Sequence, residues 1–456
     1  MKAWTHEARL LVRSRPAVAA LVLLLALSTL AVLAGLREVA RQQHTLAHLA
    51  QLQQQVLQEQ ADKLTRAGDA GNAAYYTFHD TWDAPSPAAF LALGLRDATP
   101  YVLRVRALAL QAQLHEGETF NPELALAGRF DYAFVLVYLA PLVLIALLYD
   151  LVSGERRAGR LGLLLALPGG SGRGLWLRRA GLRAGLALGG LLLPVLAAAL
   201  WQGMPVRLLA GVVAATTAYV LFWAALSVVL ATRIASPAAS ATALVGGWVL
   251  LTLLLPTLAN AVLARAVPVH QGVDLMLAQR QAVHGAWDEP REATLQRFFQ
   301  THPQWQYSTA LPAGFSWKWY YAFQQLGDES VADAFQAYRA SLQARQQWTA
   351  RLGWLLPGVG VQTALHRQAD TDLQAQLAYQ DDIAAFHARL RQYYYPYLFD
   401  ERRFTRHDFA AQPRFVARPR PEEVAGASLA GLAVAALVAA ALAWRWPTRA
   451  GWPDRR

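Results

Sequence analysis

A charged motif stands between two long apolar stretches of the chain, in the sequence DLVSGERRAGRLGLLLALP at residues 150–168. Its acidic and basic side chains could form ion pairs with complementary side chains of a soluble partner protein. The leucines that follow could anchor a short, rigid helix that moves with that partner. We therefore predict a coupling segment; the alternative is a basic loop that only fixes membrane topology. The residues that we expect to act in coupling are Glu155, Arg156, Gly159, Leu161, Leu164 and Pro168.

The lysines exclude one common nucleotide-binding motif from this chain. A Walker A loop needs a lysine directly after a glycine. The three lysines, Lys2, Lys63 and Lys318, follow methionine, aspartate and tryptophan instead. The chain therefore has no P-loop, and ATP hydrolysis of that kind requires a separate polypeptide that carries the ATP and Mg.

Other catalytic or metal-binding chemistry has little support in the sequence. His44 and His48 have a helical spacing that two metal ligands can use, but no His-Glu-x-x-His motif accompanies them. The chain has no cysteine and three methionines, which argues against thiolate and copper sites. No Gly-x-Ser-x-Gly elbow is present, although a dispersed Ser-His-Asp triad stays open. We predict no metal site and no catalytic residue, and we interpret the two histidines as part of an ordinary glutamine-rich helix.

The composition places these motifs in a membrane protein. Hydrophobic residues make up 55% of the 456 residues and charged residues 16%, whereas soluble domains have about 25% charged residues. Six apolar runs reach or approach the roughly 20 residues that a helix needs to cross a bilayer. We predict membrane-spanning helices at residues 16–36, 132–149, 180–201, 208–231, 235–264 and 424–444.

The arginines predict the orientation of these helices. They gather before the first run, between the second and third, and after the sixth. By the positive-inside rule, residues 1–15, 150–179 and 445–456 are cytoplasmic, and residues 37–131 and 265–423 form two mainly helical extracytoplasmic domains. The same rule explains the net charge of +11 without a nucleic-acid partner. Cleavage of the first run as a signal peptide is the less favoured alternative, because the run is too long.

The first extracytoplasmic segment carries two local signals. Leucines at three- and four-residue spacing, from Leu46 to Leu64, predict an amphipathic helix that continues the first span outward. Further along, the sequence DAPSP at residues 83–87 predicts a rigid turn, and the adjacent residues Arg96 and Asp97 predict a local ion pair, rather than a site.

The second extracytoplasmic segment is rich in aromatic residues. Clusters around Trp317 and Tyr394 could line a substrate surface, but we prefer an interfacial belt or a domain core. Residues 348–366 are apolar and are interrupted by glycines and Pro357. We interpret them as a surface-lying or re-entrant piece rather than as a seventh span.

The coupling motif also resembles a known family. The sequence SGERRAGRLGLLLALPGGSGRGLWLRRAG is similar to the segment of ABC-2-type transporter permeases that enters the membrane face and meets the ATPase. In those families a Glu-Arg pair precedes a glycine, a leucine-faced helix and a proline. Here these positions are Glu155, Arg156, Gly159, the leucines from Leu161 and Pro168, with Arg160 in place of the usual threonine.

Two further stretches, residues 79–116 and 121–150, are similar to a branch of these permeases with large outer insertions. That branch is related to permeases of gliding-motility and nitrous-oxide-reductase maturation systems. The resemblance implies two copies of a separate ABC ATPase, and a second permease copy or a sibling permease. It supplies no substrate.

The sequence thus predicts an all-α polytopic membrane protein with six transmembrane helices, both termini cytoplasmic, in a bacterial inner membrane. We expect the permease subunit of an ATP-driven transporter of unknown substrate. No acid or base lies in the middle of a span, which argues against a proton-coupled transporter. The alternative is a non-transporting scaffold or assembly factor that binds a periplasmic partner.

Overall fold

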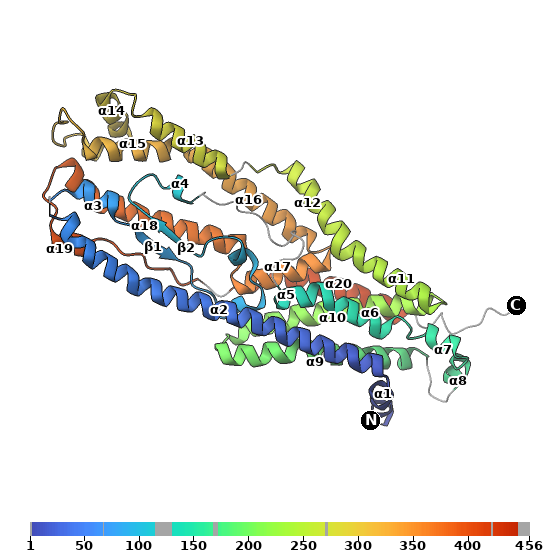
Figure 1. The fold of residues 1–456 in the computed structure, drawn as a ribbon. Helices are drawn as coiled ribbons and strands as arrows, with labels where there is room; N and C mark the ends of the chain where they lie inside the picture. The colour runs from blue at the N-terminus through green and yellow to red at the C-terminus, as the bar shows by residue number, and fades with distance from the viewer. Residues whose placement is uncertain are drawn as a thin grey trace.

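The structure is a computed structural model that describes residues 2–66, 68–114, 130–166, 172–269, 272–420 and 423–445. It is elongated, with a bundle of apolar helices at one end and a second helical body at the other (Figure 1). We call the second body the head, and the end of the bundle that carries α1, α7 and α8 the base. Pro168 lies outside the described residues.

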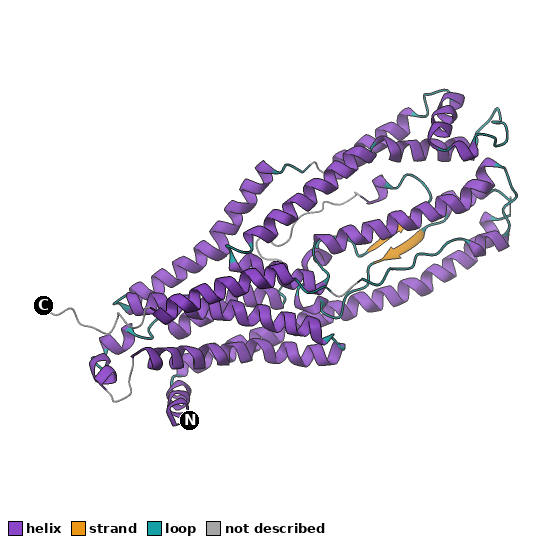
Figure 2. Cartoon of the chain, turned by 180° about the vertical axis from the view of Figure 1, so that it is seen from behind, coloured by secondary structure: helices purple, strands orange, loops and turns teal. Residues whose placement is uncertain are grey.

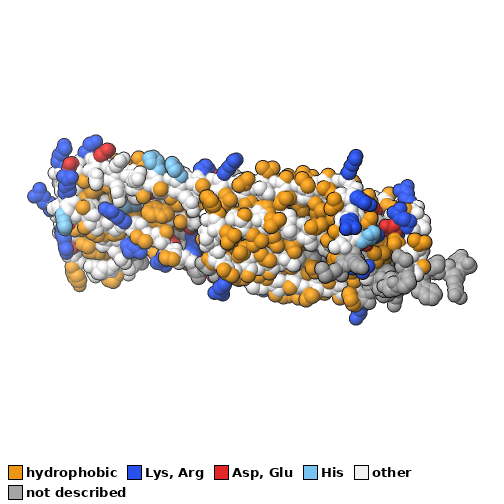
Figure 3. All heavy atoms as spheres, turned by 90° about the horizontal axis from the view of Figure 1, so that it is seen from below, with side chains coloured by type: hydrophobic (Ala, Val, Ile, Leu, Met, Phe, Trp, Pro, Cys, Tyr) orange, Lys and Arg blue, Asp and Glu red, His pale blue; other side chains and the backbone are white. Residues whose placement is uncertain are grey.

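Among the described residues, six helices are long and apolar enough to cross a membrane. They confirm the prediction that each of the six apolar runs forms a long apolar helix. On the face shown in Figure 3, hydrophobic side chains cover much of the bundle, and lysines and arginines gather toward the two ends of the molecule. Four of the six helices are single elements: α2 (Arg15–Leu64), α9 (Gly172–Gln202), α10 (Val206–Arg233) and α20 (Gly426–Arg445). The second, Tyr132–Arg157, contains α5 (Tyr132–Phe134), α6 (Ala140–Leu148) and α7 (Ser153–Arg157). The fifth, Pro237–Ala266, contains α11 (Pro237–Trp248) and α12 (Leu255–Ala266).

Two of these helices contain a π-helical turn just before a proline. The turns are η4 (Val135–Leu139), before Pro141, and η5 (Val249–Leu254), before Pro256. A proline has no N–H for the carbonyl four residues earlier, and in an apolar environment that oxygen needs another donor. For Pro141 the carbonyl is that of Val137, and it accepts a hydrogen bond of 3.0 Å from the hydroxyl of Tyr219 on α10. The proline thereby ties the second span to the fourth.

The first span continues into the head without interruption. α2 runs for 50 residues, and its second half carries the leucines that predicted an outward extension. The prediction of a continuous helix is confirmed. One rigid element therefore connects the base with the head (Figure 1).

The head is built from both segments that lie outside the bundle. A small antiparallel sheet of β1 (His79–Trp82) and β2 (Val102–Val105) lies among helices (Figure 2). Around it are α3 (Ala70–Tyr76), α4 (Gln111–Leu114), α13 (Gly272–Gly285), α14 (Arg291–Thr301), α15 (Trp317–Ser330), α16 (Ala332–Leu352), α18 (Leu373–Phe399) and α19 (Arg406–Ala411), with the short turns η1 (Ala89–Leu91), η2 (Gly94–Asp97) and η6 (Pro303–Trp305).

The two segments share one hydrophobic core, so the expected division into two domains is corrected to a single head. Ala73 and Val105 of the first segment pack in the same cluster as Tyr321 and Phe386 of the second. The largest cluster of buried apolar side chains in the head therefore needs both segments. The aromatic clusters lie mainly in this core, where Tyr321 and Tyr394 are buried. Of the two preferred interpretations, an interfacial belt and a domain core, the domain core is the one observed.

A short buried helix, α17 (Pro357–Ala369), enters the bundle from the head. At its start, a Cβ added to Gly358 would lie 3.6 Å from the hydroxyl of Tyr219, which is near the middle of α10. At its end, Gln368 lies against Gly211, one turn from the start of α10. The part of the piece that forms α17 is therefore buried in the bundle, whereas Trp354 and Leu355 before it are exposed; re-entry into a membrane stays a prediction.

Candidate functional site

The base gathers four short stretches around Arg179. The stretches are α1 (Lys2–Arg13), α7, α8 (Leu161–Ala166) and the start of α9. Arg179 donates from Nε to Glu7 at 3.0 Å and from Nη1 to Glu155 at 2.8 Å. The other carboxylate oxygen of Glu155 accepts from Nε of Arg160 at 2.7 Å. The ion pair of Glu155 with Arg179 thus connects α7 to α9, and the ion pair of Arg179 with Glu7 connects α9 to α1.

The predicted coupling residues face in different directions. Arg156 is exposed, whereas both oxygens of Glu155 are occupied by arginines of the same chain. Gly159 has a φ of 69°, a left-handed conformation that favours glycine. Leu161 and Leu164 pack against the core of the bundle. The motif is thus an ordered platform on which Arg156 is exposed, and its contact with an ATPase stays a prediction.

A second polar cluster lies where the bundle meets the head; we call it the junction. Asp83 accepts a hydrogen bond of 2.6 Å from Arg96 on one oxygen and of 2.6 Å from Arg420 on the other. Arg96 also donates to Gln42 of α2 at 3.1 and 3.0 Å. The expected partner of Arg96 was its neighbour Asp97. The observed one is Asp83, because the 3₁₀ turn η2 directs Arg96 inward.

The junction also ties α17 and α20 to the head. Arg420 binds Asp370 at 2.9 Å, just beyond the end of α17. Arg367 binds both Asp372, at 3.3 Å, and Glu423, which precedes α20. Burial raises the pKa of Asp83, and the two arginines offset only part of that effect. A cavity of about 450 Å³ opens beside these residues.

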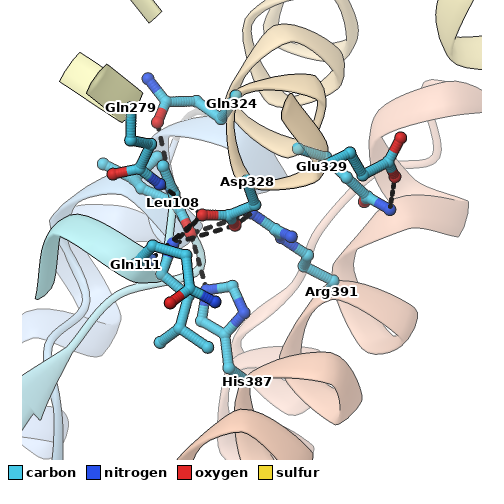
Figure 4. Close-up of polar contacts among 12 residues, drawn as sticks. Leu108, Gln111, Gln279, Gln324, Asp328, Glu329, His387 and Arg391 are labelled. Carbon is cyan, nitrogen blue, oxygen red and sulfur yellow. Dashed lines mark hydrogen bonds and ion pairs between the residues drawn. The ribbon is translucent and has the colours of Figure 1, made fainter. Parts of the chain in front are cut away.

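A third polar cluster lies inside the head and is centred on Asp328 of α15. Asp328 lies between Arg391 on one side and Gln279 on the other (Figure 4). Its carboxylate accepts from the backbone N–H of Leu110 at 2.8 Å, from that of Gln111 at 3.1 Å and from Arg391 at 2.6 Å. Gln279 of α13 donates to the same carboxylate. Asp328 thus connects the loop before α4 to α13, α15 and α18 of the second segment.

Two largely buried side chains of α18, His387 and Arg391, complete this cluster. His387 donates from Nε2 to the carbonyl of Leu108 at 2.6 Å, and Arg391 donates to the same oxygen at 3.1 Å. Burial lowers the pKa of His387 well below its usual range, so the imidazole is neutral. Burial also lowers the pKa of Arg391, but the carboxylate of Asp328 more than offsets this and leaves it raised. A cavity of about 410 Å³ lies against this cluster.

Within the described parts of the chain, no three His, Cys, Asp or Glu side chains are grouped as a metal site would require. His44 and His48 are both exposed on α2. Sequence reasoning named Arg96 but missed its partners at the junction, and it missed the residues around Asp328. Their partners are far apart in the chain, as with Asp328 and Leu110, and no local pattern marks them.

Comparison with known proteins adds one match. Residues 274–418 match a family described as a domain of unknown function, DUF3526. This range covers the helices of the head from α13 to α19, together with the buried α17. No curated protein and no solved structure matches the chain.

Proposed function

We propose that this chain is the membrane-spanning permease subunit of an ATP-driven transporter whose ATPase is a separate protein. The observation that carries the proposal is the platform at the base. Three helices, α1, α7 and α9, are joined there by Glu7, Glu155 and Arg179, while Arg156 stays exposed for a partner. The resemblance of this motif to the ATPase-binding segment of ABC-2-type permeases supports the same assignment.

The proposal places the base in the cytoplasm and the head in the periplasm of a bacterial inner membrane. The arginines at the base support this orientation through the positive-inside rule. The proposed complex has two ATPase copies and a second permease, either another copy of this chain or a sibling.

The fold offers a path from the proposed ATPase contact to the head. α2 is a single helix of 50 residues that begins beside the platform and ends in the head. At the junction, Gln42 of α2 binds Arg96, which binds Asp83. A displacement of the base would therefore move buried polar contacts of the head rather than a flexible loop.

The test is co-purification with an ATPase encoded in an adjacent reading frame. Arg156→Glu should reduce the amount of ATPase recovered in a graded manner, because reversal of a rim charge weakens binding without abolishing it. Leu164→Gln should leave the ATPase bound but uncouple its hydrolysis rate from the permease, because it loosens α8 from the bundle. Arg402→Glu, at an exposed position in the head, is the matched control.

The non-transporting scaffold gives a different result in the same experiment. It requires no ATPase, so none should co-purify at a fixed ratio, and Arg156→Glu should have no effect. That outcome would remove the transporter assignment and leave the membrane topology and the head unchanged.

A further inference from the structure

The cavity against Asp328 has a chemical character that suggests a ligand class. Its walls come from α18, the end of α15, η6 and the loop before α4. Its volume of about 410 Å³ is within the range of small-molecule sites. Ala384 and Ala388 on α18 leave this space open, because larger side chains at those positions would fill it.

The charged residues of this cavity are neutralised within the protein. Asp328 and Arg391 form an ion pair of 2.6 Å, and their side chains are only 11% and 12% exposed. Asp328 also accepts from two backbone N–H groups and from Gln279. Little charge is left for a ligand, so the cavity disfavours ionic ligands, which would have to lose their hydration without a counter-charge.

The remaining polar groups suit an uncharged ligand with many hydroxyl or amide groups. Oε1 of Gln111 and Nε of Arg391 are buried and have no hydrogen-bond partner among the described residues. Gln304 and Gln392 add two exposed amides to the wall. A hydroxyl group can donate and accept at once, and so can pair with the oxygen and the N–H groups of these two exposed amides.

One side of the cavity is aromatic. Trp305 lines it and is held by Phe399, with ring centroids 5.2 Å apart and planes 22° apart. An indole ring held in this way presents a flat apolar surface beside polar groups. A sugar ring has the matching form, with an apolar C–H face and a rim of hydroxyl groups.

We infer that the head binds a neutral oligosaccharide in the cavity bounded by Trp305, Gln111 and Arg391. The inference does not depend on the proposed transport function, since a scaffold could bind the same ligand. It goes beyond the permease assignment by placing a ligand site in the head and naming its class.

The test is saturation-transfer NMR with the full-length protein in lipid nanodiscs, which avoids detergents with sugar headgroups. The probes are chitotetraose and maltotetraose, with tetra-alanine as the peptide comparison. We expect at least one oligosaccharide to receive saturation and the peptide to receive none. Gln392→Ala should weaken the affinity for that probe about fivefold, the effect of one neutral hydrogen bond, and Trp305→Leu should weaken it more than tenfold.

Two control variants separate the cavity from general effects. Trp348→Leu removes an exposed tryptophan of α16, outside the cavity, and Gln306→Ala removes a glutamine next to η6 that does not line it. Both should bind as the wild type does. Gln392 is exposed on α18, so its variant retains the fold even if Trp305→Leu does not. The inference is overturned if neither oligosaccharide binds, if only the peptide binds, or if Gln392→Ala binds the probe as tightly as the wild type.

Discussion

Asp83 and Arg420 are 337 residues apart in the sequence, yet Oδ1 of Asp83 lies 2.6 Å from Nη2 of Arg420. Asp83 follows β1, and Arg420 lies in the segment that leads to α20. The contact therefore joins the chain leaving the first span to the chain about to enter the last. Because Arg96 binds the other oxygen of Asp83 and also Gln42, the helix α2 is part of the same unit.

Asp83→Asn should destabilise the protein more than any exposed ion-pair variant. The change leaves the guanidinium groups of Arg96 and Arg420 near a neutral amide, with side-chain exposures of 5% and 18%. Removing one partner of a buried pair costs about 3 kcal/mol or more. Asp381→Asn is the control, since its pair with Arg339 is exposed and contributes less than about 1 kcal/mol. Equal melting temperatures of the two variants would show that the junction is not a structural link.

Gly35→Ala should destabilise the protein by disturbing the packing of α2 against the turn η1 of the head. A Cβ at Gly35 would lie 2.0 Å from the carbonyl oxygen of Phe90, in the turn η1, and a backbone atom cannot move aside as a side chain can. We expect a loss of about 1–3 kcal/mol from overpacking, read as a lower thermal unfolding temperature. Gly189→Ala in α9 meets nothing within 4 Å and should be neutral or slightly stabilising. A tolerated alanine at Gly35 would contradict the close approach of α2 and η1.

The sequence predicted those parts of the fold that depend on local patterns. Six apolar runs predict six long helices, and the leucine spacing after Leu46 predicts the continuation of α2, because hydrophobic periodicity is carried by each helix alone. Contacts such as Asp83 with Arg420 depend on how distant segments meet, and the sequence carries no local signal for them. The same limit explains the single head, since the core cluster of Val105 also includes Tyr321 and Phe386, which lie more than 200 residues further along the chain.

The stability of the head should fall as the pH is lowered, through His79. Burial lowers its pKa from 6.5 to about 4, and the ring packs edge-on against Phe386 on α18. Protonation therefore favours the unfolded chain: the contribution is full above pH 6.5 and is lost as the pH falls toward 4. Between pH 7.5 and 5.5 the loss is about 1 kcal/mol.

His79→Phe should remove this part of the pH dependence, because phenylalanine has a similar shape and no proton to gain. Thermal unfolding of both proteins at pH 7.5 and 5.5 gives the comparison, and the difference between them cancels all other titrating groups. If both lose the same stability between the two values, His79 is not the titrating residue.

The proposed orientation can be tested with single cysteines, because the native chain has none. Tyr307 in the head is 94% exposed, and Leu163 at the base is 71% exposed. In cells with a permeable outer membrane and an intact inner membrane, Tyr307→Cys should react with a membrane-impermeant thiol reagent and Leu163→Cys should not. After the inner membrane is opened, both should react. Labelling of Leu163→Cys before that step would reverse the assigned orientation.

Glu155 and Arg156 are neighbours in the motif, but their substitution should have different effects. Glu155 binds Arg160 and Arg179 within the chain, whereas Arg156 is exposed. Glu155→Gln should therefore loosen the base of the permease by itself, with faster proteolysis after Arg157 or Arg160 by trypsin, and should weaken ATPase binding as a secondary effect. Arg156→Gln should leave proteolysis at these sites unchanged and weaken ATPase binding directly.

A double-mutant cycle with Arg179 distinguishes the two roles. If Glu155 acts through Arg179, the double variant should show a smaller increase in proteolysis than the sum of the increases in Glu155→Gln and Arg179→Gln, because the contact between the two residues is already lost in each single variant. Arg156→Gln combined with Arg179→Gln should instead show independent effects, one on ATPase binding and one on proteolysis. If Glu155→Gln reduced ATPase recovery while the protease pattern stayed that of the wild type, Glu155 would have to contact the ATPase itself. The internal ion pairs would then have to open when the complex forms.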